Sequence, residues 1–130
     1  MNISVLQTTL QKTLTGQITF PQVVAALVAE GVESYHVDLV REEFSYYQGN
    51  GYSLVEKAEL TTKKPAHEFS VDQVRAAIRA SQVGEIKFKE FIDRLLDAGC
   101  VFYITYLAGK KVIYFGRNGD FHVENFPVKS

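Results

Sequence analysis

Side chains suited to metal binding or acid–base chemistry gather on one predicted strand and on the hairpin beside it. His36 and Asp38 are two positions apart, so they share one face of a strand, and Tyr47 and Glu56 follow on the neighbouring hairpin. Imidazole and carboxylate groups can bind a divalent cation or exchange protons with a substrate. The alternative is a solvated strand face with a cross-strand ion pair. We favour that alternative because no second His or Cys lies at ligand spacing.

No other motif in the sequence predicts catalysis or a bound cofactor. Cys100 follows a helix-ending glycine and is expected to pack as a small hydrophobe. The serines lack the GxSxG nucleophile motif, and the segments GNG and GRNG are typical of hairpin turns rather than of phosphate-binding loops. We therefore predict no catalytic residue, no metal and no cofactor, and we favour a binding protein over an enzyme.

The composition narrows the classes of partner. The chain has 130 residues, a formal net charge of −1 and a single cysteine. A near-neutral net charge argues against a protein that binds nucleic acid. A single cysteine cannot form an intramolecular disulfide. No signal peptide and no apolar run of membrane-spanning length is present. We expect a cytoplasmic protein that acts on neither nucleic acid nor membrane.

The elements that must position these residues come from an internal duplication. Residues 16–58 and 84–126 align without a gap, and the identical pairs include Gly31/Gly99, Tyr35/Tyr103 and Asn50/Asn118. Each copy has two helical stripes followed by three strand patterns. The fold class predicted is α+β: a duplicated α-α-β-β-β unit whose antiparallel sheet has helices packed on one face. One domain is expected over residues 1–130, with repeat one at about 1–58, a linker at 59–69 and repeat two at about 70–126.

Turn residues predict how the strands face. Asn50-Gly51 and Asn118-Gly119 predict two-residue type I′ hairpins, and Gly109-Lys110 predicts a type II′ turn. These registers sort the strand residues onto two faces. The predicted core face carries Tyr35, Val37, Leu39, Phe44, Tyr46, Val55, Tyr103, Leu107, Val112, Tyr114, Phe121 and Val123. The predicted second face is polar in repeat one, with Ser34, His36, Asp38, Ser45, Tyr47, Leu54 and Glu56.

In repeat two, by contrast, the second face is apolar, although His122 and Glu124 are also placed there. Five large apolar side chains on one sheet face would form a patch of the size that usually marks a partner or a ligand. Three alternatives are open: the chain covers the patch itself, through the first helix, the linker or the C-terminal tail; the patch is a subunit interface; or it is a small-ligand pocket. The leading interpretation is a homodimer. The five residues are Phe102, Ile104, Tyr106, Ile113 and Phe115.

The strand 35–41, together with the segment 18–21 and the pair Tyr46-Tyr47, resembles the small bacterial and prophage-encoded YbcV-like proteins. The resemblance extends over the whole chain. It implies a family of unknown function, some of whose members are labelled phage envelope proteins, and it carries over no catalytic residue or ligand. A phage-associated regulator acting on a host protein is a further interpretation.

Overall fold

The structure of the protein is a computed structural model, and it describes residues 1–60 and 63–127. Each repeat contributes two helices and then three strands, which confirms the predicted α-α-β-β-β duplication. The first repeat forms α1 (Ile3–Leu14), α2 (Phe20–Ala29), β1 (Val32–Asp38), β2 (Glu43–Gln48) and β3 (Ser53–Lys57). The second forms α3 (Val71–Gln82), α4 (Phe88–Asp97), β4 (Cys100–Tyr106), β5 (Lys111–Gly116) and β6 (Phe121–Asn125).

Polar side chains fix where two of the helices begin. The Ser70 hydroxyl accepts a hydrogen bond from the backbone N–H of Gln73 at 3.2 Å, which caps α3. At the start of α2, the Gln22 side chain accepts a hydrogen bond from the backbone N–H of Thr19 at 2.8 Å. Pro21 lies in the first turn of α2, where its missing N–H removes no helical hydrogen bond. These starting points agree with the sequence pattern.

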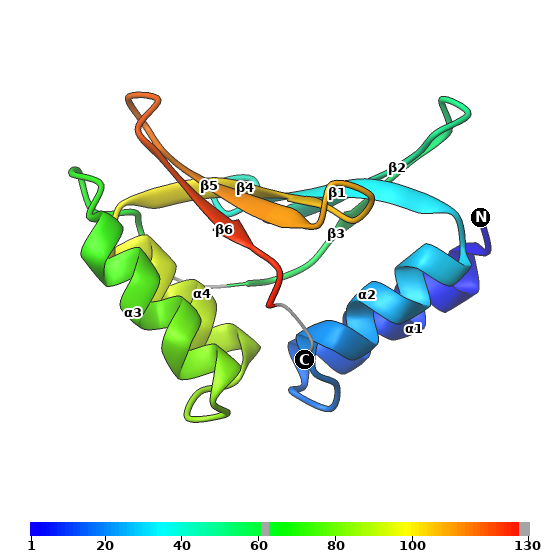
Figure 1. Ribbon diagram of the computed structural model, residues 1–130, viewed down its shortest axis with the longest axis horizontal. Coiled ribbons are helices and arrows are strands. Elements are labelled where there is room, and N and C mark those ends of the chain that lie inside the picture. Colours follow the sequence, from blue (N-terminus) through cyan, green and yellow to red (C-terminus); the bar gives the residue numbers. More distant parts are fainter. Residues whose placement is uncertain (61–62, 128–130) are drawn as a thin grey trace.

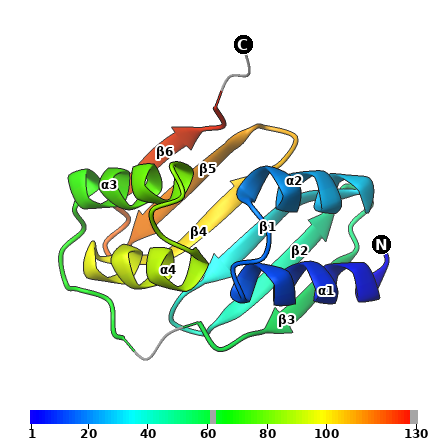
Figure 2. The same ribbon diagram turned by 90° about the horizontal axis from the view of Figure 1, so that it is seen from below.

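All six strands form one antiparallel sheet in the order β3-β2-β1-β4-β5-β6. The sequence left open whether there would be one sheet or two. The four helices lie on the same face of this sheet, as predicted, and they leave the opposite face uncovered (Figure 1). Seen from the helical side, the pair α1/α2 and the pair α3/α4 lie next to each other in front of the strands (Figure 2).

The two repeats meet through the pairing of β1 with β4. In this pairing His36 lies opposite Ile104, and Ser34 lies opposite Tyr106. Ile104 is the residue that the gapless alignment makes the counterpart of His36, and Tyr106 is the counterpart of Asp38. An approximate two-fold axis therefore passes between His36 and Ile104 and relates one repeat to the other.

The outer hairpin loops differ from the predicted type I′ turns. In the second repeat the Gly116 N–H donates to the Asp120 carbonyl at 2.8 Å, and the Gly119 N–H donates to the Gly116 carbonyl at 3.2 Å. Gly119 has a φ of +87°, whereas Asn118 has no positive φ. The loop is a type I turn followed by a left-handed glycine, one residue longer than predicted. Gly51 has a φ of +92° in the equivalent loop of the first repeat, so the type I′ prediction was wrong in both copies.

The extra loop residue turns β3 and β6 over, because a register shift of one exchanges the two faces of a strand. Ile113 pairs with Val123 and Tyr114 pairs with His122, so Val123 faces away from the helices and His122 faces them. The same inversion holds in β3. The predicted faces were wrong for Leu54, Val55, Glu56, Phe121, His122, Val123 and Glu124.

The β4–β5 turn is also longer than the predicted type II′ turn. Tyr106 pairs with Lys111, and Lys110 rather than a glycine adopts a positive φ of 56°. This register differs from the predicted one by two positions, so it keeps every side chain of β4 and β5 on its predicted face.

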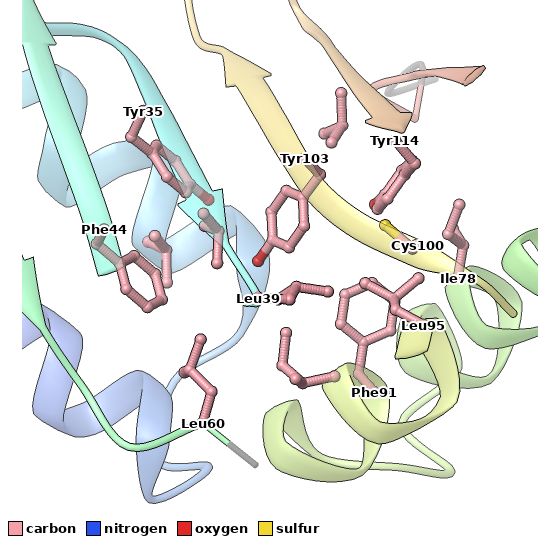
Figure 3. Packing of buried hydrophobic residues seen from close by; sticks show 14 of the residues in the cluster. Tyr35, Leu39, Phe44, Leu60, Ile78, Phe91, Leu95, Cys100, Tyr103 and Tyr114 are labelled. Atoms are coloured by element: carbon pink, nitrogen blue, oxygen red, sulfur yellow. The ribbon is translucent and has the colours of Figure 1, made fainter. Parts of the chain in front are cut away.

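The core fills the space between the sheet and the helices, and Figure 3 shows rings from neighbouring strands standing off the sheet toward them. The remaining residues of the predicted core face are all buried. Fully buried Leu95 and Leu96 of α4 and Leu6 of α1 supply the helical side. These buried residues of the predicted core face are Tyr35, Val37, Leu39, Phe44, Tyr46, Tyr103, Leu107, Val112 and Tyr114.

The linker between the repeats runs on the helical side. Leu60 is 2% exposed and belongs to the core, and the Ala66 N–H donates to the Leu96 carbonyl at the end of α4 at 2.8 Å. Linker residues 61 and 62 lie outside the described residues.

Candidate functional site: the open face of the sheet

The sheet face that points away from the helices is lined by three side chains from each strand, and none of them is buried. Because the strands of the two repeats are equivalent, every position on this open face in one repeat has its counterpart on the open face in the other. The first repeat supplies Ser34, His36, Asp38, Glu43, Ser45, Tyr47, Ser53, Val55 and Lys57. The second supplies Phe102, Ile104, Tyr106, Lys111, Ile113, Phe115, Phe121, Val123 and Asn125.

Strands β4 to β6 carry the apolar part of the open face. The rings of Phe102 and Phe115 are stacked with centroids 4.8 Å apart. Phe121, at the sheet edge, is 60% exposed, and Val123 is 39% exposed. We call the apolar half the set formed by the five residues that the sequence singled out and these two: Phe102, Ile104, Tyr106, Ile113, Phe115, Phe121 and Val123.

The described part of the chain leaves the apolar half uncovered. Helix α1 lies on the opposite face (Figure 1), and the linker residue Leu60 packs into the core. The tail residue Phe126 contacts Phe20 of α2 edge to face, with ring centroids 5.3 Å apart. Within the described residues, none of the three segments considered as an internal cover therefore lies on the open face of these strands.

We call the open face of β1, β2 and β3 the polar half, and three of the four candidate ligand-binding residues, His36, Asp38 and Tyr47, lie on it. The His36 ring lies against Tyr47 with centroids 4.8 Å apart, and partial burial lowers the pKa of His36. The Asp38 carboxylate already has partners in the adjacent turn, because its Oδ1 accepts hydrogen bonds from the backbone N–H groups of Val40 and Arg41 at 3.0 and 2.9 Å. Its carboxylate therefore stabilises the β1–β2 turn.

Glu56 does not join this cluster. It pairs with Phe44, which is 4% exposed, so it faces the helices, and its carboxylate accepts a hydrogen bond from Gln7 Nε2 of α1 at 3.1 Å. Grouping Glu56 with His36 and Asp38 on one face was wrong, because the longer hairpin loop inverts β3. Ligand binding at His36, Asp38 and Tyr47 stays a prediction. Among the described residues, no three His, Cys, Asp or Glu side chains are close enough together to hold a metal ion.

The sequence reasoning missed Phe121 and Val123 as members of the open face. The signal that could have found them is the Asn-Gly pair itself, since a type I turn ending in a left-handed glycine accommodates it as well as a type I′ turn does. A loop with a left-handed Gly119 places both residues beside Ile113 and Phe115. The apolar surface is thereby wider by one strand than the sequence indicated.

The second repeat is also the region where the chain matches a protein-family model. A protein-family model described as Protein of unknown function (DUF1398) matches residues 52–125, which is more than half of the chain. The chain belongs to this family. In this DUF1398 member the matched region contains β3 and all of α3 to β6, and with them the whole apolar half. The match does not bear on the YbcV-like name or on an association with phage.

No curated protein matches this DUF1398 member. Within the described ranges, its helices are all too short or too polar to cross a membrane.

Proposed function

We propose that this DUF1398 protein is a binding protein that self-associates by packing its open sheet face against the same face of a second copy. The observation that carries the proposal is the apolar half, whose seven side chains face away from every described helix. A contiguous apolar patch of this kind on a globular protein usually marks an interaction surface.

A second copy suits this surface because an isologous contact must be self-complementary. Two copies of the apolar half can meet across a two-fold axis without burying any charge opposite an apolar side chain. Twisted sheets are known to pack face to face at a separation of about 10 Å, so a contact between two such faces uses a common mode of sheet packing. Lys111, the charged residue among the open-face positions of β4 to β6, lies at the end of β5.

The available area predicts a weak to moderate dimer. Each outward side chain occupies about 30 Å² of sheet, because strands are about 4.8 Å apart and outward positions recur about every 6.6 Å. At about 30 Å² per side chain, the seven residues of the apolar half present about 210 Å², and the 18 positions of the whole face present about 540 Å². A stable interface buries about 800 Å² per partner. The polar half must therefore also contribute, and we expect dimerisation that depends on concentration in the micromolar range.

Ile113→Asp tests the proposal, with Ser45→Asp as its matched control. Ile113 and Ser45 are counterparts in the two repeats, so the same carboxylate enters the apolar half in one variant and the polar half in the other. Sedimentation velocity over a concentration series should show a monomer–dimer equilibrium for the native protein. Ile113→Asp should abolish the dimer, and Ser45→Asp should weaken it much less. Circular dichroism should show the same fold in all three.

Two results would contradict self-association. One is a native protein that stays monomeric up to hundreds of micromolar, and the other is an Ile113→Asp variant that dimerises as the native protein does.

We also propose that the protein resides in the cytoplasm. Cys100 is a buried free thiol, which suits a reducing compartment. Fractionation of cells that carry the native gene tests this location, and recovery of the protein outside the cytoplasm would contradict it. We likewise propose the prophage association that the YbcV-like resemblance implies. Specific pull-down of a phage or host protein would support it.

A further inference from the structure

The other face of the sheet holds a cavity of about 440 Å³, between the strands and the two helix pairs. Its floor is formed by β2, β1, β4 and β5, and its walls are formed by residues of all four helices and their connecting loops. Both repeats contribute equivalent positions, such as Ile18 and Ile86. The volume lies within the range of small-molecule sites and far exceeds the roughly 30 Å³ that one water occupies.

Polar groups without protein partners converge on this cavity. Each of the four floor strands contributes one tyrosine, and burial raises the pKa of all four, so the phenols stay protonated and able to donate. Figure 3 shows the rings of Tyr35, Tyr103 and Tyr114 directed from the sheet toward the helices. Among the described residues, the hydroxyls of Tyr46, Tyr103 and Tyr114 form no hydrogen bond.

Among these polar groups, the buried Thr105 hydroxyl gives the strongest indication of a ligand. The Thr105 side chain is 0% exposed, it lines the cavity, and its hydroxyl has no hydrogen-bond partner among the described residues. Tyr35 is its register partner on β1, and burial raises the Tyr35 pKa to about 12 although the nearby Thr105 hydroxyl partly offsets this effect. That contact lacks the geometry of a hydrogen bond. The counterpart of Thr105 in the first repeat is Val37, so the scaffold itself requires no hydroxyl at this position.

The charges at the cavity wall are already paired. Lys87 Nζ donates to the Gly16 carbonyl at 3.3 Å. Glu124 is bound by Arg79 at 3.0 Å and by His122 at 3.1 Å. A charged ligand would therefore be buried without a counter-ion, which is costly. The rest of the lining is largely apolar and includes the rings of Phe20, Phe88, Phe91 and Phe126 and, on the floor strand β2, that of Phe44.

We propose that this cavity binds an uncharged aromatic molecule that carries one hydroxyl or carbonyl group. The phenylalanine rings contact the body of the ligand, and its polar group forms a hydrogen bond with the Thr105 hydroxyl. The Tyr35 side chain, which lies beside Thr105, completes the polar end of the site. This binding site is independent of the open face, which lies on the other side of the sheet.

Isothermal titration calorimetry with three related probes tests the ligand class. 2-Naphthol is uncharged and carries a hydroxyl, naphthalene lacks the hydroxyl, and 2-naphthoate is an anion at neutral pH. We expect saturable binding of one 2-naphthol per chain, binding of naphthalene at least several-fold weaker, and no measurable binding of 2-naphthoate.

Two variants locate the site. Thr105→Val copies the residue of the first repeat and should remove most of the preference for 2-naphthol over naphthalene while naphthalene still binds. Val23→Phe copies its counterpart Phe91 and places a ring in the cavity, so it should weaken 2-naphthol binding at least ten-fold. Circular dichroism and thermal unfolding should show that both variants stay folded. Ile113→Asp, on the open face, should leave 2-naphthol binding unchanged.

Absence of saturable 2-naphthol binding up to its solubility limit would overturn the proposal. Binding that survives Val23→Phe but is lost in Ile113→Asp would place the probe on the open face and would also overturn it. Should Val23→Phe fail to fold, the loss of discrimination in Thr105→Val decides the question, because retained discrimination contradicts the assignment of Thr105.

Discussion

His36 on β1 and Ile104 on β4 lie directly opposite each other, and the approximate two-fold axis that relates the repeats passes between them. Each is the counterpart of the other, yet one is an imidazole and the other an aliphatic side chain. The boundary between the polar and the apolar half of the open face therefore runs through this pair. Moving that boundary is the most direct way to change how the face behaves.

We call His36 and Ile104 the axial pair. Making the two residues identical should strengthen self-association when both are Ile and weaken it when both are His. His36→Ile extends the apolar surface onto β1 and should tighten the dimer several-fold, because another aliphatic side chain becomes available for burial. Ile104→His should weaken the dimer by a similar factor. Dimer dissociation constants from sedimentation equilibrium measure both effects, and equal constants for the two variants would contradict the role given to the axial pair.

The inverted register of β6 predicts that Val123 contributes little to stability. Val123→Ala should cost less than about 1 kcal/mol because Val123 is 39% exposed on a strand. Val37→Ala makes the same change at a residue that is 0% exposed, and it should cost about 2–3 kcal/mol. Urea denaturation measures both. Similar losses would indicate that Val123 is buried, as a two-residue turn would have placed it.

The comparison of β6 with the helices shows which features a sequence can predict. Apolar spacing and cap residues such as Ser70 act locally, so the helices and their order were predictable. The hairpin loop type was not, because Asn118-Gly119 suits two turns that differ by one residue. That single residue decides on which face His122 and Val123 lie. The cavity was beyond prediction, since its walls come from two repeats whose relative placement depends on the β1–β4 pairing.

Substitution by alanine should destabilise the protein far more at Gly99 than at Gly84. Both have a positive φ, of 82° and 77°. A Cβ on Gly84 would meet nothing within 4 Å, so Gly84→Ala should cost only the conformational penalty of about 1–2 kcal/mol. A Cβ on Gly99 would collide with the backbone carbonyl of Glu68, so Gly99→Ala should be more destabilising by at least 2 kcal/mol. Thermal unfolding of both variants tests this, and equal melting temperatures would contradict the packing of the linker against Gly99.

In the group formed by Arg79, Glu124 and His122, we expect loss of the Glu124 carboxylate to destabilise the fold more than loss of the Arg79 guanidinium. Burial raises the pKa of Glu124, but the hydrogen bonds from His122 and Arg79 together outweigh it and lower the pKa. Glu124→Ala leaves His122, which is 8% exposed, without its carboxylate partner and should cost about 1–3 kcal/mol. The Arg79 side chain is 60% exposed, so Arg79→Ala should cost less than 1 kcal/mol. Chemical denaturation at neutral pH ranks the two, and the reverse order would contradict this account.

Buried thiol and phenol groups predict a loss of stability at high pH. Burial raises the pKa of Cys100 from 9.0 to about 12 and that of Tyr35 from 10.0 to about 12. Between these values the unfolded chain releases protons that the folded chain keeps, so the free energy of unfolding should change little between about pH 7 and pH 8 and should fall from about pH 9 upward. Urea denaturation from pH 7 to pH 11 measures this. Cys100→Ala should reduce the slope near pH 9 to 10, and an unchanged slope would contradict the contribution of the thiol.

The β1–β4 ladder has a consequence for how the molecule could have diverged. Two identical half-length chains joined through such a ladder would carry the same side chain on both sides of the axis, so every imidazole there would face an imidazole. A single chain with two repeats is free of that constraint. One repeat can change its outer surface from polar to apolar, and one buried Val can differ from its Thr counterpart, while the shared glycines and tyrosines hold the architecture constant. Gene fusion would thus turn a symmetric scaffold into one whose two halves can specialise separately.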